Sequence, residues 1–221
     1  MDRIYRVFIV DDHPMVRLGV AHLIGLERQF EVCGEADGGA DALVALDLLY
    51  EGGDVDIVVV DLSLEDINGL ELIKQIRSRY PDLKVLVLSM HDEQIYAERT
   101  LRAGAQGYVM KRETASEVAV ALNRIIHGDV YVSDEVASSM LGKMVGSTND
   151  GGDVDSLTDR ELEVLHHLGQ GLAPRHVAEE LGISVKTVEA HRESMKRKLD
   201  IGSAAELTQF AVQWAQRHAT L

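Results

Sequence analysis

Three carboxylates, a hydroxyl and a lysine stand close behind short apolar runs in the first half of this 221-residue chain, in a pattern that can hold a cation. They are Asp11, Asp12, Asp61, Ser89 and Lys111. If the runs are parallel strands of one sheet, their carboxyl ends meet at one edge, near the point where the strand order reverses. Converging carboxylates repel one another unless a cation neutralises them, and Mg²⁺ accepts a few carboxylates together with water and phosphoryl groups. The pattern predicts phosphoryl transfer onto a carboxylate, giving an aspartyl-phosphate.

The elements that must position these residues alternate between two patterns over residues 1–127. Apolar, β-rich runs are predicted to form strands at 7–10, 31–36, 55–60, 84–88 and 107–110. Amphipathic stretches are predicted to form helices near 14–26, 40–50, 69–79, 94–103 and 116–127. Five such units predict an α/β fold, a doubly wound five-stranded parallel sheet with helices on both faces.

The rest of the chain reads as a short tether followed by a small all-α domain. Residues 133–145 predict a short helix, and the small, polar and acidic stretch 147–155 predicts a linker. Thr158 and Glu161 form a predicted capping box. Gly182 and the cap Ser184 separate two helices by a tight turn, as in a helix-turn-helix. We therefore predict domains at 1–127 and 156–221, joined by a tether helix and linker at 128–155.

Composition excludes several classes of protein. The mean hydropathy is −0.04, and no apolar run approaches the ~20 residues that span a bilayer. The N-terminus lacks the apolar core of a secretion signal, and the single cysteine, Cys33, excludes an intrachain disulfide. Residues 1–155 contain 14 Lys and Arg against 28 Asp and Glu, whereas residues 156–221 contain 8 against 9. We expect a cytoplasmic protein without membrane contact, in which only the C-terminal part can approach DNA.

The first ~127 residues resemble the flavodoxin-like receiver domain of response regulators. The resemblance rests on Asp11-Asp12-His13-Pro14, on Asp61 with Asn68-Gly69, on Leu88-Ser89, and on Ala103-Gly104-Ala105 with Gly107-Tyr108 and Lys111. It implies that Asp61 is the phosphoacceptor for a sensor histidine kinase. It also implies that Asp12 and Asp61 bind Mg²⁺ through their side chains, Ser63 through its carbonyl, and Asp11 chiefly through water. Ser89 would hydrogen-bond the phosphoryl group, Tyr108 would reorient with it, and Lys111 would form its ion pair.

The loop after Asp61 departs from the family pattern. The family usually has a proline four residues after the phosphoacceptor, and this chain has Glu65 followed by Asp66. The loop thereby loses a fixed φ and gains two negative charges that we expect beside the metal. Either Mg²⁺ binds somewhat differently here, or the acidic loop helps to select the kinase.

Residues 156–221 resemble a LuxR-type DNA-binding domain, so that the whole chain is similar to a NarL/FixJ-type response regulator. The resemblance rests on Leu157-Thr158-Asp159-Arg160-Glu161, on Leu181-Gly182-Ile183-Ser184, and on Thr187-Val188 with His191 and Lys198-Leu199. Helix 185–199 places Val188, Met195 and Leu199 on a core face and carries five of the eight basic residues of the domain. We predict DNA contacts at Lys186, Thr187, Glu189, Ala190, His191, Arg192, Lys196, Arg197 and Lys198. His191 could equally be buried for structural reasons, and Glu193 is expected to pair with Lys196 or Arg197. The resemblance further implies a homodimer in the active state.

The sequence thus predicts a two-component transcription regulator, not an enzyme, that accepts a phosphoryl group on Asp61 and thereby controls sequence-specific DNA binding. One alternative is a regulator that is never phosphorylated and binds DNA constitutively or answers a small ligand. A second is a phosphatase of the haloacid-dehalogenase type, which would need an acidic residue two positions after Asp61, where the chain has Ser63. The kinase, the stimulus, the operator and the sign of regulation do not follow from the sequence.

Overall fold

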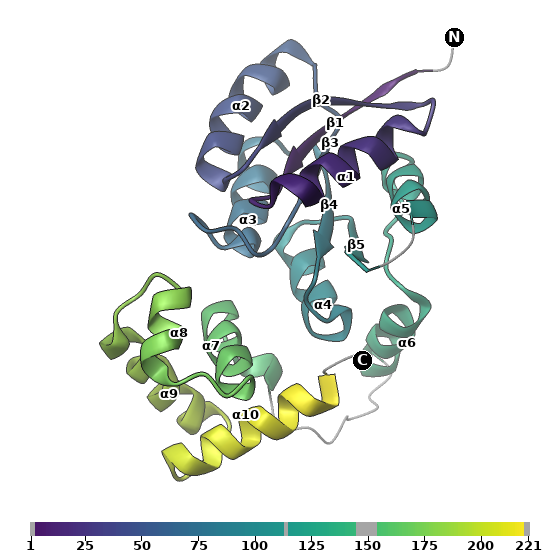
Figure 1. Cartoon of the computed structure of the whole chain (residues 1–221). Coiled ribbons are helices and arrows are strands. Elements are labelled where there is room, and N and C mark those ends of the chain that lie inside the picture. The colour runs from purple at the N-terminus through teal and green to yellow at the C-terminus, as the bar shows by residue number, and fades with distance from the viewer. Residues whose placement is uncertain (1–2, 113–114, 145–153, 219–221) are drawn as a thin grey trace. The chain divides into compact units, whose positions relative to one another are not determined.

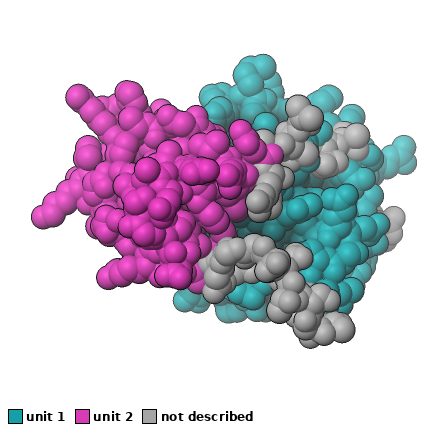
Figure 2. All heavy atoms as spheres, turned by 90° about the horizontal axis from the view of Figure 1, so that it is seen from below, with its two compact units in different colours: residues 1–146 teal, residues 147–221 magenta. Residues whose placement is uncertain are grey.

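The computed structural model describes residues 3–112, 115–144 and 154–218. The chain divides into two compact units, residues 1–146 and 147–221, whose elements are labelled in Figure 1 and which are coloured separately in Figure 2. Most of the predicted linker, 147–153, lies outside the described residues. The predicted boundaries at 127 and 156 remain predictions.

The first unit is built on the predicted five-stranded parallel sheet, which the structure confirms. Its strands are β1 (Tyr5–Val10), β2 (Phe30–Ala36), β3 (Ile57–Val60), β4 (Lys84–Ser89) and β5 (Gly107–Met110). They are ordered β2-β1-β3-β4-β5, and all neighbours are parallel. All four residues of β3 are buried, because helices cover both faces of a parallel sheet. The strand order reverses between β1 and β3, so that the crevice at their carboxyl ends is the expected place for a site.

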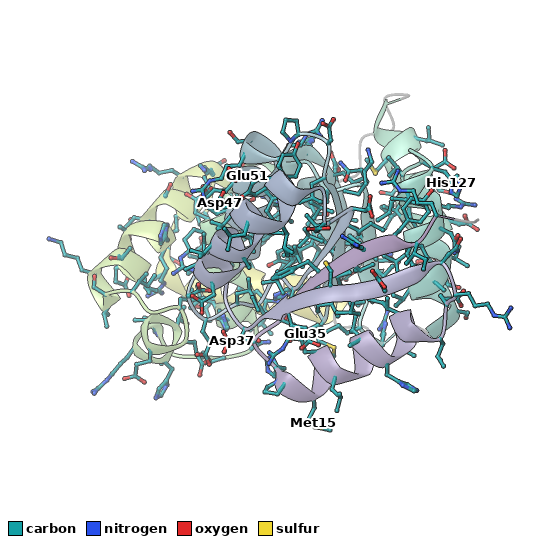
Figure 3. The ribbon with its side chains drawn as sticks, turned by 90° about the horizontal axis from the view of Figure 1, so that it is seen from above. Met15, Glu35, Asp37, Asp47, Glu51 and His127 are labelled. Atoms are coloured by element: carbon teal, nitrogen blue, oxygen red, sulfur yellow. The ribbon has the colours of Figure 1, made fainter. Side chains whose placement is uncertain are left out.

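Five helices form the two outer layers (Figure 1). Helices α1 (Pro14–Gly25) and α5 (Ala115–Ile126) pack on one face, while α2 (Gly39–Gly52), α3 (Gly69–Arg79) and α4 (Glu93–Ala103) lie on the other. Alternate residues of a strand pack against opposite helical layers. Val7 and Ile9 of β1, for example, share a core cluster with Ile24 and Leu122. The acidic surplus of this unit lies at its surface, as Figure 3 shows for Glu35 and Asp37 near the end of β2 and for Asp47 and Glu51 on α2.

The segment after α5 extends the sheet at the edge of β5. The Tyr108 N–H donates to the Tyr131 carbonyl, and the Tyr131 N–H donates to the Gln106 carbonyl, both at 2.9 Å. The chain then enters α6 (Asp134–Met144), the predicted tether helix, whose first turn is capped by Ser133 Oγ. Helix α6 packs on α4, and its Val136 is buried, with 3% of its surface exposed. The tether helix therefore belongs to the first compact unit.

The second unit is all-helical, as predicted. After the short 3₁₀ turn η1 (Val154–Ser156) come α7 (Asp159–Gly169), α8 (Pro174–Glu180), α9 (Val185–Lys198) and α10 (Ala204–His218). The capping box of Thr158 and Glu161 is present, and the Ser184 side chain caps α9. Gly182 turns the chain between α8 and α9 with a φ of +60°, a conformation that glycine adopts without strain. Helices α8 and α9 form the predicted helix-turn-helix.

Candidate functional site

Two buried carboxylates share one lysine at the carboxyl end of the sheet. The Asp61 N–H donates to the Val10 carbonyl at 2.9 Å and fixes the residue beside the end of β1. Lys111 Nζ lies 2.6 Å from Asp61 Oδ2 and 2.7 Å from Asp11 Oδ2. Asp61 is 2% exposed and Asp11 is 3% exposed. The structure thus brings together residues from the ends of β1, β3 and β5, which the sequence predicts to converge.

The single positive charge of Lys111 does not neutralise the carboxylates of Asp11, Asp12 and Asp61. Burial raises the pKa of Asp61 and outweighs the Lys111 ammonium and the Ser63 amide, which lower it. Burial alone would lower the pKa of Lys111, but its bonds to Asp11 and Asp61 raise it. Within the described part of the chain, Asp12 Oδ1 and Asp61 Oδ1 are buried and have no hydrogen-bond partner. Carboxylate oxygens that lack a donor fit a divalent cation, since Mg²⁺ is bound by hard oxygen ligands.

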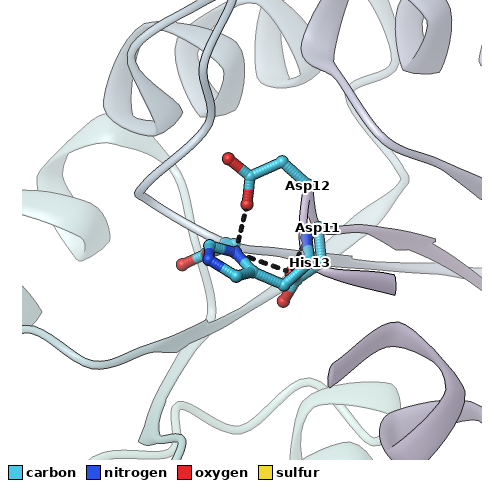
Figure 4. Close-up of side chains that lie close together, drawn as sticks. Asp11, Asp12 and His13 are labelled. Atoms are coloured by element: carbon cyan, nitrogen blue, oxygen red, sulfur yellow. Dashed lines mark hydrogen bonds and ion pairs between the residues drawn. The ribbon is translucent and has the colours of Figure 1, made fainter. Parts of the chain in front are cut away.

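Asp12 and His13 complete the cluster on the β1 side (Figure 4). One ligand-capable atom of each of Asp11, Asp12, His13 and Asp61 lies within 4.8 Å of the others. His13 Nδ1 is 2.5 Å from Asp12 Oδ1 and 3.7 Å from Asp11 Oδ1. The sequence predicts the carboxylates at this place, but it gave His13 no role beyond its part in the motif.

His91 connects three of the predicted residues and was missed by sequence reasoning. Its N–H donates to Ser89 Oγ at 3.1 Å, and its carbonyl accepts from Tyr108 Oη at 2.7 Å. Its Nε2 lies 3.1 Å from Ser63 Oγ, the exposed hydroxyl two residues after Asp61. Tyr108 is 1% exposed, and burial raises the pKa of its phenol well above the ordinary range. The one available signal was the position of His91, two residues beyond Ser89 at the end of β4.

The acidic loop after Asp61 is bound to the beginning of α2 through Asp66. The Asp66 carboxylate accepts the N–H groups of Gly39 at 2.9 Å and Ala40 at 2.8 Å, at the beginning of α2. Burial would raise the pKa of Asp66, but these backbone donors lower it. The negative charge of Asp66 is thus stabilised at the N-terminus of α2, and its expected effect on the metal stays a prediction. Glu65 and Asp66 are both exposed, but Asp66 is held by these backbone donors.

The predicted DNA-contacting residues on α9 fall into two groups. Lys186, Thr187, Ala190 and Arg197 are exposed. Arg192 is bound to Glu189 at 2.6 Å, Lys196 to Glu193 at 2.8 Å and Lys198 to Glu161 of α7 at 2.6 Å. The predicted pairing of Glu193 with Lys196 is thus present. His191 is half-buried, while Val188 and Met195 are fully buried, as the core prediction requires.

Glu161 and Lys198 tie the beginning of α7 to the end of α9. The Glu161 carboxylate accepts from the Thr158 N–H at 2.7 Å and from Lys198 Nζ at 2.6 Å. Burial would raise the pKa of Glu161, but the bonds from Lys198, Ser194 and Thr158 lower it to about 2. The orientation of α9 is therefore supported by an ion pair inside the second unit.

A parallel α/β unit with an acidic pocket at the strand-order reversal, followed by a helix-turn-helix unit, defines a two-part regulator. Residues 7–123 match the response regulator receiver domain, and residues 155–211 match the luxR family of bacterial regulatory proteins. The chain belongs to the two-component response regulators of the NarL/FixJ type. It is a transcription regulator with a receiver domain and a LuxR-type DNA-binding domain.

Relatives of known role match over most of their length. The chain is 36% identical over 201 residues to the transcriptional regulatory protein UhpA of Salmonella typhimurium. This match covers 91% of this chain and 94% of that protein. It is 33% identical over 216 residues to the transcriptional regulatory protein LiaR of Bacillus subtilis, covering 96% and 98%. The RcsB response regulator of Salmonella typhimurium has a similar structure, with a TM-score of 0.69 and 25% identity over 96% of this chain and 98% of that one. RcsB bound to promoter DNA with the phosphomimetic BeF₃⁻ matches with a TM-score of 0.63 and 26% identity, over 95% of this chain and 99% of that one. No described helix of this chain has the length and apolarity needed to cross a membrane.

Proposed function

We propose that Asp61 is the phosphoacceptor and that its phosphorylation controls DNA binding by the second unit. The observation that carries this proposal is the bridge of Lys111 Nζ between Asp61 Oδ2 and Asp11 Oδ2, in a pocket with two unpartnered carboxylate oxygens. The site then holds one cation and three carboxylates, which suits a second cation and an incoming phosphoryl group.

The side chains of Asp12 and Asp61 and the carbonyl of Ser63 would hold Mg²⁺, with Asp11 acting chiefly through water. When bound, the ion neutralises the charge on the phosphoryl oxygens during transfer. An Asp61 carboxylate oxygen attacks the phosphorus of a kinase phosphohistidine, the P–O bond forms, and the P–N bond breaks as the imidazole leaves. Lys111 exchanges its bond to Asp61 for an ion pair with a phosphoryl oxygen.

Ser89 and Tyr108 would carry the change away from Asp61. In the structure Ser89 Oγ accepts the N–H of His91, whose carbonyl accepts from Tyr108 Oη. A Ser89 hydroxyl that turns to donate to a phosphoryl oxygen shifts His91, and Tyr108 then loses its acceptor. A charge placed at Asp61 is thereby coupled to the packing of β5 and α4.

A labelling experiment tests the phosphoacceptor. We expect acetyl phosphate to label the protein only when Mg²⁺ is present, and Asp61→Asn to abolish the labelling while the fold is retained. The matched control is Asp66→Asn, which neutralises another carboxylate of the same loop and should leave the labelling intact. Label on the Asp61→Asn variant would show that another residue is the phosphoacceptor, and no label on the unsubstituted protein would support a regulator that is not phosphorylated.

The exposed basic residues of α9 are proposed to neutralise DNA phosphates. Among the described residues, Lys186 and Arg197 have no ion-pair partner, whereas Lys198 is held by Glu161. Lys186→Ala and Arg197→Ala should each reduce the dependence of log affinity on log salt by about 1. Arg175→Ala is the control, because Arg175 on α8 is also exposed but pairs with Glu179 at 3.3 Å. An unchanged salt slope for both α9 variants would refute this assignment.

The remaining features of the proposal follow from the family. The partners are a sensor histidine kinase, double-stranded DNA and a second copy of the chain in the active state. The protein would act in the cytoplasm as a regulator, not as an enzyme. Sedimentation of the protein before and after phosphorylation, at matched concentration, tests the homodimer.

A further inference from the structure

The imidazole of His13 offers a nitrogen atom in a cluster of carboxylates. Its Nδ1 lies 2.5 Å from Asp12 Oδ1 and 3.7 Å from Asp11 Oδ1 (Figure 4). Asp61, which is 2% exposed, completes the set of ligand-capable atoms, and its Oδ1 has no hydrogen-bond partner in the described part of the chain. The cluster therefore offers a mixed set of oxygen and nitrogen atoms to one ion.

The backbone holds the imidazole in this place. Pro14 follows His13 and excludes it from the helical region, so that His13 has an extended backbone with φ −95° and ψ 107°. The His13 N–H donates to Asp11 Oδ1 at 2.8 Å. Although His13 is the N-cap residue of α1, its side chain makes no capping hydrogen bond. The imidazole ring therefore contacts the carboxylates and does not cap the helix.

The imidazole of His13 lies in close contact with the carboxylate of Asp12. Asp12 Oδ1 is buried and has no hydrogen-bond partner among the described residues, although His13 Nδ1 lies 2.5 Å away. The ring nitrogen and this carboxylate oxygen are close enough to bind the same ion. The ring itself is 64% exposed, so it stands at the solvent side of the pocket, where an ion enters.

We propose that His13 Nδ1 is an additional ligand of the divalent ion and that it shifts the preference of the site from Mg²⁺ towards first-row transition ions such as Mn²⁺ and Co²⁺. This inference rests on the proposed function, since it requires the carboxylates to bind a divalent ion. Mg²⁺ takes oxygen ligands almost exclusively, whereas imidazole nitrogen adds affinity for transition ions in the Irving–Williams order. A nitrogen ligand therefore changes the ratio of affinities more than it changes the affinity for Mg²⁺.

The opposing explanation is that His13 is a protonated counter-charge to Asp12. An imidazolium competes with every divalent ion, so its removal would raise the affinity for Mg²⁺ and Co²⁺ alike. The two explanations thus predict changes of opposite sign, and binding measurements separate them.

The experiment is direct titration of the full-length protein with Mg²⁺ and with Co²⁺, by calorimetry and, for Co²⁺, by its visible absorption. We expect His13→Ala to weaken Co²⁺ binding at least about tenfold, since even an outer-shell partner is worth that much, and Mg²⁺ binding by less than about threefold. His13→Gln is the second variant, which offers an amide oxygen and should also lose the preference for Co²⁺. The control is His22→Ala, because His22 is exposed on the same helix and follows nine residues later.

Asp12→Ala provides the baseline for ions bound at other histidines. Equal effects of His13→Ala on both ions, no effect, or tighter binding of both would overturn the inference while leaving the acidic site in place. If the unsubstituted protein and Asp12→Ala bind both ions identically, the acidic site itself fails and the proposed function fails with it. A change in the Co²⁺ absorption spectrum of His13→Ala, but not of His22→Ala, is the expected spectroscopic sign of the lost nitrogen.

Discussion

Asp61→Asn should make the first unit more stable when no divalent ion is present. Asp61 is 2% exposed, and its Oδ1 is buried without a partner among the described residues. An unsatisfied buried acceptor costs about 1–3 kcal/mol, and more when it is charged. Asparagine keeps the shape of the side chain and an acceptor for Lys111, but it removes the charge. We therefore expect a gain of about 1–3 kcal/mol in the free energy of unfolding at pH 7.

Mg²⁺ should reduce or reverse this difference. A ligand that binds only the folded state at 100 times its dissociation constant stabilises by about 2.7 kcal/mol. The unsubstituted protein should gain this amount, and the variant should gain much less because it has lost a ligand. The pH dependence has a definite sign, since the pKa of Asp61 is raised in the folded state. The cost of its charge is absent below the ordinary pKa of 3.8 and appears as the pH rises through the folded value. The advantage of the variant should vanish in acid.

The distribution of aromatic residues provides the assay. All six tyrosines lie within residues 1–146, and the single tryptophan, Trp214, lies in the second unit. Urea unfolding followed by near-ultraviolet tyrosine dichroism therefore reports the first unit, and Trp214 fluorescence reports the second. The tyrosine transition should move with Asp61→Asn, and the tryptophan transition should stay in place as an internal control. A variant less stable than the parent without Mg²⁺, or one that gains equally from Mg²⁺, would refute the reasoning.

Three further predictions concern single contacts. Glu161→Gln keeps an acceptor for the capping box but removes the charge facing Lys198, so the second unit should lose about 3 kcal/mol at pH 7. Because the pKa of Glu161 is lowered to about 2, its contribution is complete above pH 4.5 and is lost as the pH falls towards 2, and a pH series of Trp214 fluorescence in urea checks this loss. Gly69→Ala would place a Cβ 2.5 Å from the Leu62 Cα, so it should cost about 1–3 kcal/mol by urea unfolding and slow phosphorylation. Asp66→Ala should cost about 0.5–2 kcal/mol by removing the cap of α2, seen as faster amide exchange at the beginning of that helix.

The elements of the fold were predictable because their signals are local. Buried parallel strands are continuous apolar runs, and the residues that end or begin helices are set by backbone chemistry. Thr158 with Glu161 and Ser184 before α9 are examples in which the structure confirms the predicted cap. The convergence of Asp11, Asp61 and Lys111 also followed, since parallel strands present their carboxyl ends at the same edge.

The partners of individual side chains were not predictable in the same way. Asp66 binds the first turn of α2, which precedes it by 26 residues, and no periodicity reports such a contact. His91 contacts Ser89, Tyr108 and Ser63 because β3, β4 and β5 end side by side. These pairings depend on which surfaces meet after folding.

The backbone bonds between Tyr131 and β5 bear on where the chain can be cut. Without residues 128–144, the outer edge of β5 would present unpaired N–H and C=O groups to solvent, and such an edge recruits strands from other molecules. A fragment ending at residue 127 should accordingly self-associate, while one ending at residue 144 should stay dispersed. If so, an isolated receiver that stays dispersed requires residues 128–144, the stretch that leads towards the DNA-binding unit, in addition to the helices that cover its sheet.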